Sequence, residues 1–132
     1  MKALLCALAF AVVMPACAGA TASTDDVVRV RIEHSTFIPS SIHVERGATV
    51  QFEIVNDDPI DHEFIIGDTR VQTRHERGAH TNHGKIPGEV SVPAGATATT
   101  TYEFRRPGKL IIGCHLPAHY EYGMKARVTV AA

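Results

Sequence analysis

The chain has 132 residues, with 13 lysines and arginines against 14 aspartates and glutamates, and a formal net charge of −1 when histidine is neutral. This balance provides no basic surface for a nucleic acid, and the length fits one compact domain. Residues 1–20 are predicted to be a signal peptide, because Met1 and Lys2 precede an apolar run at 3–14 that is too short to span a membrane. We therefore expect an exported protein, located in the periplasm, in the medium or on the outer face of the membrane.

The three cysteines have different predicted fates. Cys6 lies in the leader, and Cys17 is either removed with the leader or lipidated, which is the one expected membrane attachment. Residues 21–26 are predicted to be a short flexible linker before a domain at 27–132. That domain keeps only Cys114, and a single thiol in an exported protein is expected to be paired, reactive or metal-bound.

The domain is predicted to be all-β. Val28, Val30 and Ile32 alternate with charged residues, which is the period of a half-buried strand. Phe37, Ile38 and Pro39 interrupt it, because proline removes a donor from the ladder. Apolar and β-branched runs between Gly and Pro turns predict further strands at 42–44, 48–55, 62–66, 89–92, 97–104, 109–114 and 124–130. Short strands at this spacing predict a Greek-key β-sandwich of about seven to eight strands.

A polar insertion at 67–88 carries His75, His80 and His83. Three histidines in so short a segment suggest either a second, weaker copper or zinc site or a solvated loop across the sandwich. We favour the loop, because no acidic or cysteine partner sits at a fixed spacing from these histidines.

The segment 113–124 carries Cys114, His119 and Met124 at intervals of five residues, and His62 lies far upstream. A thiolate and two imidazoles in one plane, with a long axial thioether, are the ligands of a mononuclear blue-copper site. Zinc takes cysteine, histidine and carboxylate and has little use for a thioether. The set serves both Cu(I) and Cu(II), which suits electron transfer. We therefore expect one copper ion.

Segment 104–124 resembles the copper-binding signature of the cupredoxins, the superfamily of plastocyanin and azurin, and segment 56–62 resembles the part that delivers their first histidine. The resemblance covers 27–130, and the ligand loop is similar to the longer loops of the superfamily. It implies a sandwich with copper near one end. The resemblance implies that His62, Cys114 and His119 are the equatorial copper ligands and that Met124 is the weak axial ligand.

Glu63 and His115 follow two of the expected ligands directly in the sequence. Glu63 stands after His62, where many members of the superfamily have an asparagine that orients the loop and the thiolate. We expect Glu63 to be a solvated carboxylate on the other strand face; if it approached the metal instead, the site would be harder. His115 is expected to point to the opposite face from Cys114 and not to bind the metal.

The resemblance implies a one-electron carrier that uses Cu(I) and Cu(II). Such a carrier has no catalytic residues and is a monomer that docks transiently with a redox partner protein, through an apolar rim beside His119. The alternative is an extracytoplasmic copper-binding protein for copper handling or resistance, aided by the insertion at 67–88. An enzyme with Cys114 as nucleophile and His119 as base is disfavoured, because no orienting acid is evident.

Overall fold

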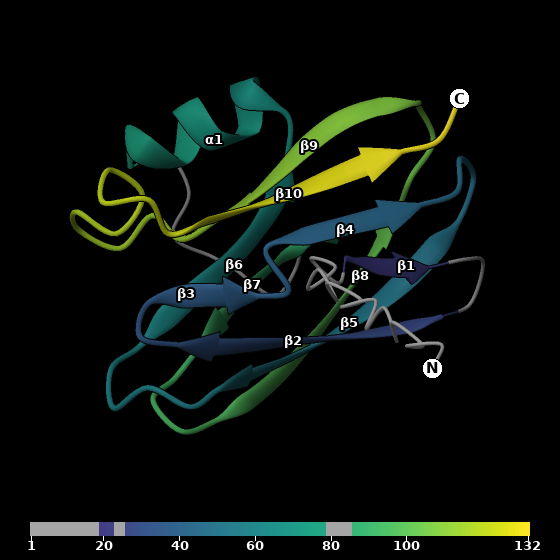
Figure 1. The fold of residues 1–132 in the computed structure, drawn as a ribbon. Coiled ribbons are helices and arrows are strands. Elements are labelled where there is room, and N and C mark those ends of the chain that lie inside the picture. The colour runs from purple at the N-terminus through teal and green to yellow at the C-terminus, as the bar shows by residue number, and fades with distance from the viewer. Residues whose placement is uncertain (1–18, 23–25, 79–85) are drawn as a thin grey trace, which may run out of the picture.

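The computed structural model describes residues 19–22, 26–78 and 86–132. All but the last two residues of the leader predicted at 1–20 lie outside the described residues, and so do His80 and His83 of the insertion. Two β-sheets pack face to face around a hydrophobic core, and one helix lies outside them (Figure 1). No helix in these three ranges is long and apolar enough to cross a membrane.

The described residues contain ten strands in two sheets. The first sheet has, in spatial order, β1 (Ala20–Ala22), β4 (Ser41–Val44), β10 (Lys125–Val130), β9 (Gly108–Gly113), β6 (His62–Gly67) and β7 (Glu89–Val92). The second has β3 (Thr36–Ile38), β2 (Val27–Glu33), β5 (Thr49–Asn56) and β8 (Thr97–Glu103). The all-β sandwich is confirmed and all eight predicted strands are present. The short strands β1 and β3 raise the number above the predicted seven to eight.

Both additional strands form around a buried apolar side chain. Ala22 in β1 is 1% exposed, and β1 pairs in parallel with β4. The first two residues of the linker predicted at 21–26 are therefore part of a sheet, although the predicted domain boundaries themselves stay predictions. Phe37 in β3 is fully buried, and β3 pairs with β2 directly after a tight turn. The strand ends at the turn of His34 and Ser35, so the interruption predicted at Phe37, Ile38 and Pro39 was wrong for Phe37 and Ile38, which lie in the new strand β3.

Four phenylalanines join the two sheets. The Phe64 ring lies 6.2 Å from that of Phe37 and 5.2 Å from that of Phe52, and Phe104 lies 6.3 Å from Phe52, measured between ring centroids. Each such pair adds roughly 0.5–1.5 kcal/mol beyond the burial of its area. Alternate residues of a strand face the same side, so His62, two residues before Phe64 on β6, also points inward and is 1% exposed. The packing of β6 thus determines the direction of that imidazole.

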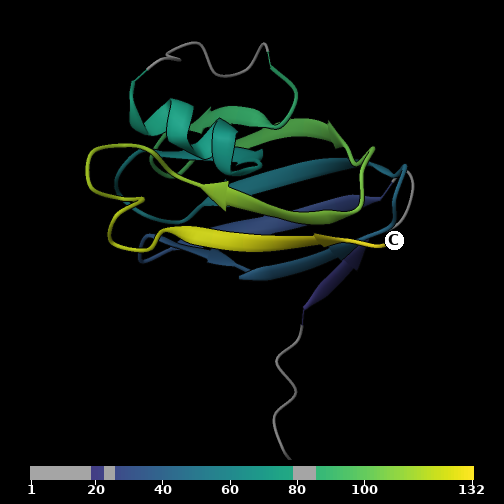
Figure 2. The same ribbon diagram turned by 90° about the horizontal axis from the view of Figure 1, so that it is seen from above.

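The insertion at 67–88 contains a helix, α1 (Thr69–Glu76), so the prediction of a loop was wrong over these residues. The Asp68 carboxylate accepts the backbone N–H groups of Arg70 and Val71 at 3.0 and 3.1 Å and so caps the helix. Gln72 and His75, three residues apart on one face, are buried. Figure 2 shows α1 on one side of the sandwich, where it contacts β6 and β9.

The Asp68 cap provides a test of whether α1 contributes to stability. Asp68→Ala leaves two N–H groups of the first turn without their acceptor, and we expect it to reduce the free energy of unfolding by about 1 kcal/mol. Asp68→Ser keeps a capping oxygen, so its free energy of unfolding should fall by only a small part of that amount. Urea unfolding measures both variants, and equal losses in the two would contradict the assigned role of the cap.

Candidate metal centre

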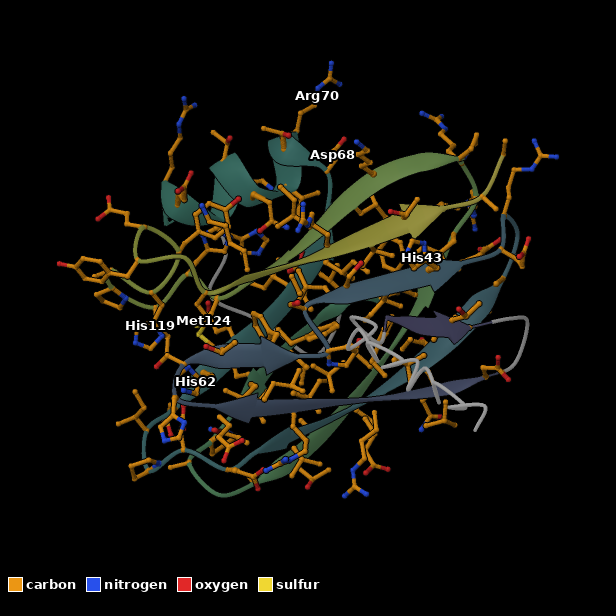
Figure 3. The ribbon with its side chains drawn as sticks, in the orientation of Figure 1. His43, His62, Asp68, Arg70, His119 and Met124 are labelled. Atoms are coloured by element: carbon orange, nitrogen blue, oxygen red, sulfur yellow. The ribbon has the colours of Figure 1, made fainter. Side chains whose placement is uncertain are left out.

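The predicted ligands come from separate elements that meet at one end of the sandwich. His62 begins β6, Cys114 follows the last residue of β9, and His119 and Met124 lie in the loop between β9 and β10. The register places Gly113 of β9 opposite Ile65 of β6, which brings the two strand ends together. Figure 3 shows His62, His119 and Met124 grouped at this end.

The donor atoms converge on the thiol. The Cys114 sulfur lies 3.9 Å from His62 Nδ1 and 3.2 Å from His119 Nδ1. In the part of the chain that the structure describes, His62, Cys114 and His119 are the one group of three or more His, Cys, Asp or Glu donors close enough to share a metal ion, within 4.8 Å of one another. Met124 is 2% exposed, and its backbone N–H donates to the carbonyl of His119 at 3.0 Å. The structure therefore brings the four predicted residues together.

Asp58 controls the orientation of His62. His62 Nε2 lies 2.9 Å from Asp58 Oδ2, and the same carboxylate accepts the backbone N–H groups of His34 and Ser35, each at 2.7 Å. Burial acts to raise the pKa of Asp58, but the bonds from Ser35, His34 and His62 outweigh it and hold that pKa below its usual value. A carboxylate only accepts hydrogen bonds, so Nε2 carries a hydrogen, and Nδ1 is the ring nitrogen that faces Cys114.

The protonation of the other two donors follows from their surroundings. Burial raises the pKa of the Cys114 thiol, against the effect of the N–H groups of Leu116 and Glu63, so the thiol keeps its proton until a metal displaces it. Burial, together with the neighbouring His62, lowers the pKa of His119, so its imidazole is neutral at neutral pH. A neutral imidazole is the form that binds a metal.

The chemistry of this donor set fits copper. One sulfur and two imidazole nitrogens lie close together, and the buried Met124 lies beside them (Figure 3). The carboxylates of Asp58 and Glu63 accept hydrogen bonds from other groups. Soft sulfur ligands select Cu(I), and imidazole suits Cu(II). Among the described residues, the group of converging donor atoms includes no carboxylate oxygen, which harder cations prefer.

The family model described as the cupredoxin-like domain matches residues 4–130. The chain belongs to the cupredoxin-like family. This cupredoxin is similar to the copper-resistant cuproprotein CopI of Rubrivivax gelatinosus, with 34% identity over 116 residues, 85% of this chain and 70% of that protein. It is 26% identical to CopI of Pseudomonas aeruginosa, over 71% of this chain and 70% of that protein. Reduced auracyanin from Roseiflexus castenholzii shares the fold, with a TM-score of 0.70 at 21% identity, over 84% of this chain and 100% of that one.

Glu63 binds the ligand loop of this cupredoxin, so the prediction of a solvated carboxylate was wrong. Its backbone N–H donates to the Cys114 sulfur at 3.3 Å, and its carboxylate accepts the backbone N–H of His115 at 3.2 Å. One residue therefore holds the thiol and the next peptide together. The Glu63 side chain thus connects the start of β6 to the loop that follows Cys114.

A second polar cluster lies between α1 and the ligand loop. Gln72 donates to the carbonyls of Ile65 at 3.2 Å and Ile111 at 2.8 Å, and its own oxygen accepts from His115 Nε2 at 2.7 Å. Gly113 makes this approach possible, because a Cβ there would lie 2.7 Å from the Gln72 oxygen. His115 thus points away from Cys114, as predicted, and it connects the ligand loop to the helix.

His75, a candidate for a second metal site, is engaged inside this cluster. Its Nδ1 lies 2.9 Å from the carbonyl of Val71, and its Nε2 lies 3.2 Å from the Glu89 carboxylate. Glu89 is the acidic partner that sequence reasoning did not find, because it lies on β7, beyond the insertion. With both ring nitrogens in hydrogen bonds, His75 is not disposed to bind a metal. His80 and His83, the other two histidines of the alternative second site, lie outside the described residues.

Proposed function

We propose that this cupredoxin is an exported copper-binding protein for copper resistance, which binds one copper ion through His62, Cys114, His119 and Met124. The observation that carries the proposal is the convergence of the Cys114 thiol and one imidazole nitrogen each of His62 and His119, all within 4.8 Å of one another. The similarity to proteins named CopI supports copper resistance above the electron carrier that we expected first. Bound copper supplies a one-electron change between Cu(I) and Cu(II), and the residues around it hold and orient the ligands.

Electron transfer is the second candidate, and the loop around His119 favours it. His119 is half-buried, and the neighbouring Pro117 and Ala118 are exposed. A small apolar surface beside a metal ligand suits brief docking to a redox partner protein. In this case the protein would act as a monomeric carrier, and copper tolerance would not depend on it.

The proposed function is tested first by copper binding. We expect Cu(II) titration of the mature protein to end at one equivalent, with a strong thiolate-to-copper absorption band in the visible and a narrow copper hyperfine splitting in paramagnetic resonance. A colourless product, or several weakly bound equivalents, would contradict a site that contains Cys114.

Growth on copper separates the two candidate functions. In a bacterium made copper-sensitive by loss of its own protein of this kind, the wild-type gene should restore growth on copper and Cys114→Ser should not. The matched control is His43→Ala, which removes an exposed histidine of β4. If the wild-type protein binds copper with the expected band but leaves tolerance unchanged, copper resistance is contradicted and the electron carrier is favoured.

A further inference from the structure

We propose that the carboxylate of Asp58, acting through His62, favours Cu(II) over Cu(I) at this site and lowers its reduction potential. The inference rests on the proposed function, because it takes His62 as a copper ligand. Asp58 is thus a positioning residue: it touches the far nitrogen of the imidazole and not the metal. Nothing in the sequence distinguishes it from the neighbouring Asp57 and Asp61.

The hydrogen-bonded pair of His62 and Asp58 is buried. The His62 side chain is 0% exposed and that of Asp58 is 9% exposed, and their hydrogen bond is 2.9 Å long. Charges interact more strongly in such surroundings than in water, because little solvent screens them. The negative charge of Asp58 therefore acts on the imidazole ring, whose other nitrogen faces Cys114.

The Asp58 carboxylate has no lysine or arginine partner among the described residues. Its oxygens accept the backbone N–H groups of His34 and Ser35 and the Nε2–H group of His62. Asp57, the next residue back, is different. It is paired with the Arg31 guanidinium at 2.8 Å, and its side chain is 39% exposed. The negative charge of Asp57 is thus neutralised by Arg31 and screened by solvent, whereas that of Asp58 acts directly on His62.

The consequence for copper follows from charge. A carboxylate bonded to the outer nitrogen of a metal-binding histidine makes the inner nitrogen a stronger donor. Cu(II) carries one more positive charge than Cu(I), so the stronger donor and the nearby negative charge stabilise Cu(II) more. Deleting the charge should favour Cu(I).

Asp58→Asn tests the charge with little change of shape. The amide oxygen can replace Oδ2 and accept from Ser35 and His62, while the amide nitrogen loses the bond from His34. We expect the ratio of Cu(I) affinity to Cu(II) affinity to rise about tenfold, which equals about 59 mV for a one-electron couple. Asp57→Asn is the matched control. It removes one charge at the neighbouring residue, and the ratio should change by less than about twofold because Arg31 and solvent screen that charge.

The outcomes separate the inference from the proposed function. If the ratio of Cu(I) affinity to Cu(II) affinity is equal in the two variants, or is unchanged in Asp58→Asn, the role assigned to Asp58 is wrong. The proposed copper binding is not contradicted by either result. A wild-type protein without the cysteine-to-copper band would instead contradict the proposed function.

A measurement on the copper-free wild-type protein keeps the inference testable if Asp58→Asn does not fold. Long-range ¹H–¹⁵N NMR reports which nitrogen of His62 carries hydrogen. We expect hydrogen on Nε2, in slow exchange with water, and a bare Nδ1. Hydrogen on Nδ1 with a bare Nε2 would show that Asp58 does not orient the ring, and the inference would be wrong.

Discussion

Replacing Cys114 by serine is expected to abolish the visible band of the copper-loaded protein and to weaken Cu(I) binding by more than about 100-fold, beyond the loss typical of residues that only support a ligand. The band arises from electron density that moves from the thiolate to copper, and a hydroxyl oxygen is too hard a donor to replace it. Cys114 is fully buried, and serine is nearly the same size, so the fold should persist. Visible absorption and competition with a Cu(I) chelator measure the two effects.

The control is again His43→Ala. His43 lies on β4, far along the sandwich from His119 (Figure 3), so its loss should leave both the band and the affinity unchanged. A pH series adds a second readout. Because burial raises the pKa of Cys114, copper must displace its proton, and wild-type affinity should rise about tenfold per pH unit below that pKa. Cys114→Ser should lack this contribution. An unchanged band in Cys114→Ser would show that the ligand assignment is wrong.

The sequence predicts the sandwich well because its strands carry the signal in their own composition. Val28, Val30 and Ile32 alternate with charged residues, and β2 buries these three side chains and exposes most of the others. The ligand types are equally local, since Cys114 and His119 share one loop whose ends are fixed by β9 and β10. His62 lies far from this loop in the sequence, and it was identified as a ligand through the resemblance to the superfamily.

The residues around the ligands were not predictable, because tertiary contacts alone select them. Asp58 differs from Asp57 only because the turn at His34 and Ser35, more than twenty residues earlier, places two N–H groups against it. His75 and Glu89 are 14 residues apart in the sequence, and the hydrogen bond between them forms only in the folded chain. The helix α1 was missed because it is eight residues long, and so short a helix is stabilised by packing rather than by its own pattern.

Gln72→Leu is expected to have the largest effect on stability among changes outside the ligands. Gln72 is 1% exposed, and its amide bonds β6 at Ile65, β9 at Ile111 and the ligand loop at His115. Leucine fills a similar volume but leaves one buried and two part-buried polar groups without this partner. Each such group costs about 1–3 kcal/mol, so the free energy of unfolding should fall by about 3 kcal/mol or more.

The same change also tests whether α1 supports the metal centre. His115 follows Cys114, so loss of its bond to Gln72 should shift or broaden the copper band without removing it, since all four ligands remain. Urea unfolding and visible absorption measure the two effects. Arg74→Leu, an exposed substitution on the same helix, is the control and should stay within about 0.5 kcal/mol of the wild type. If Gln72→Leu matches Arg74→Leu in both measurements, the helix is an addition to the sandwich that does not hold the copper loop in place.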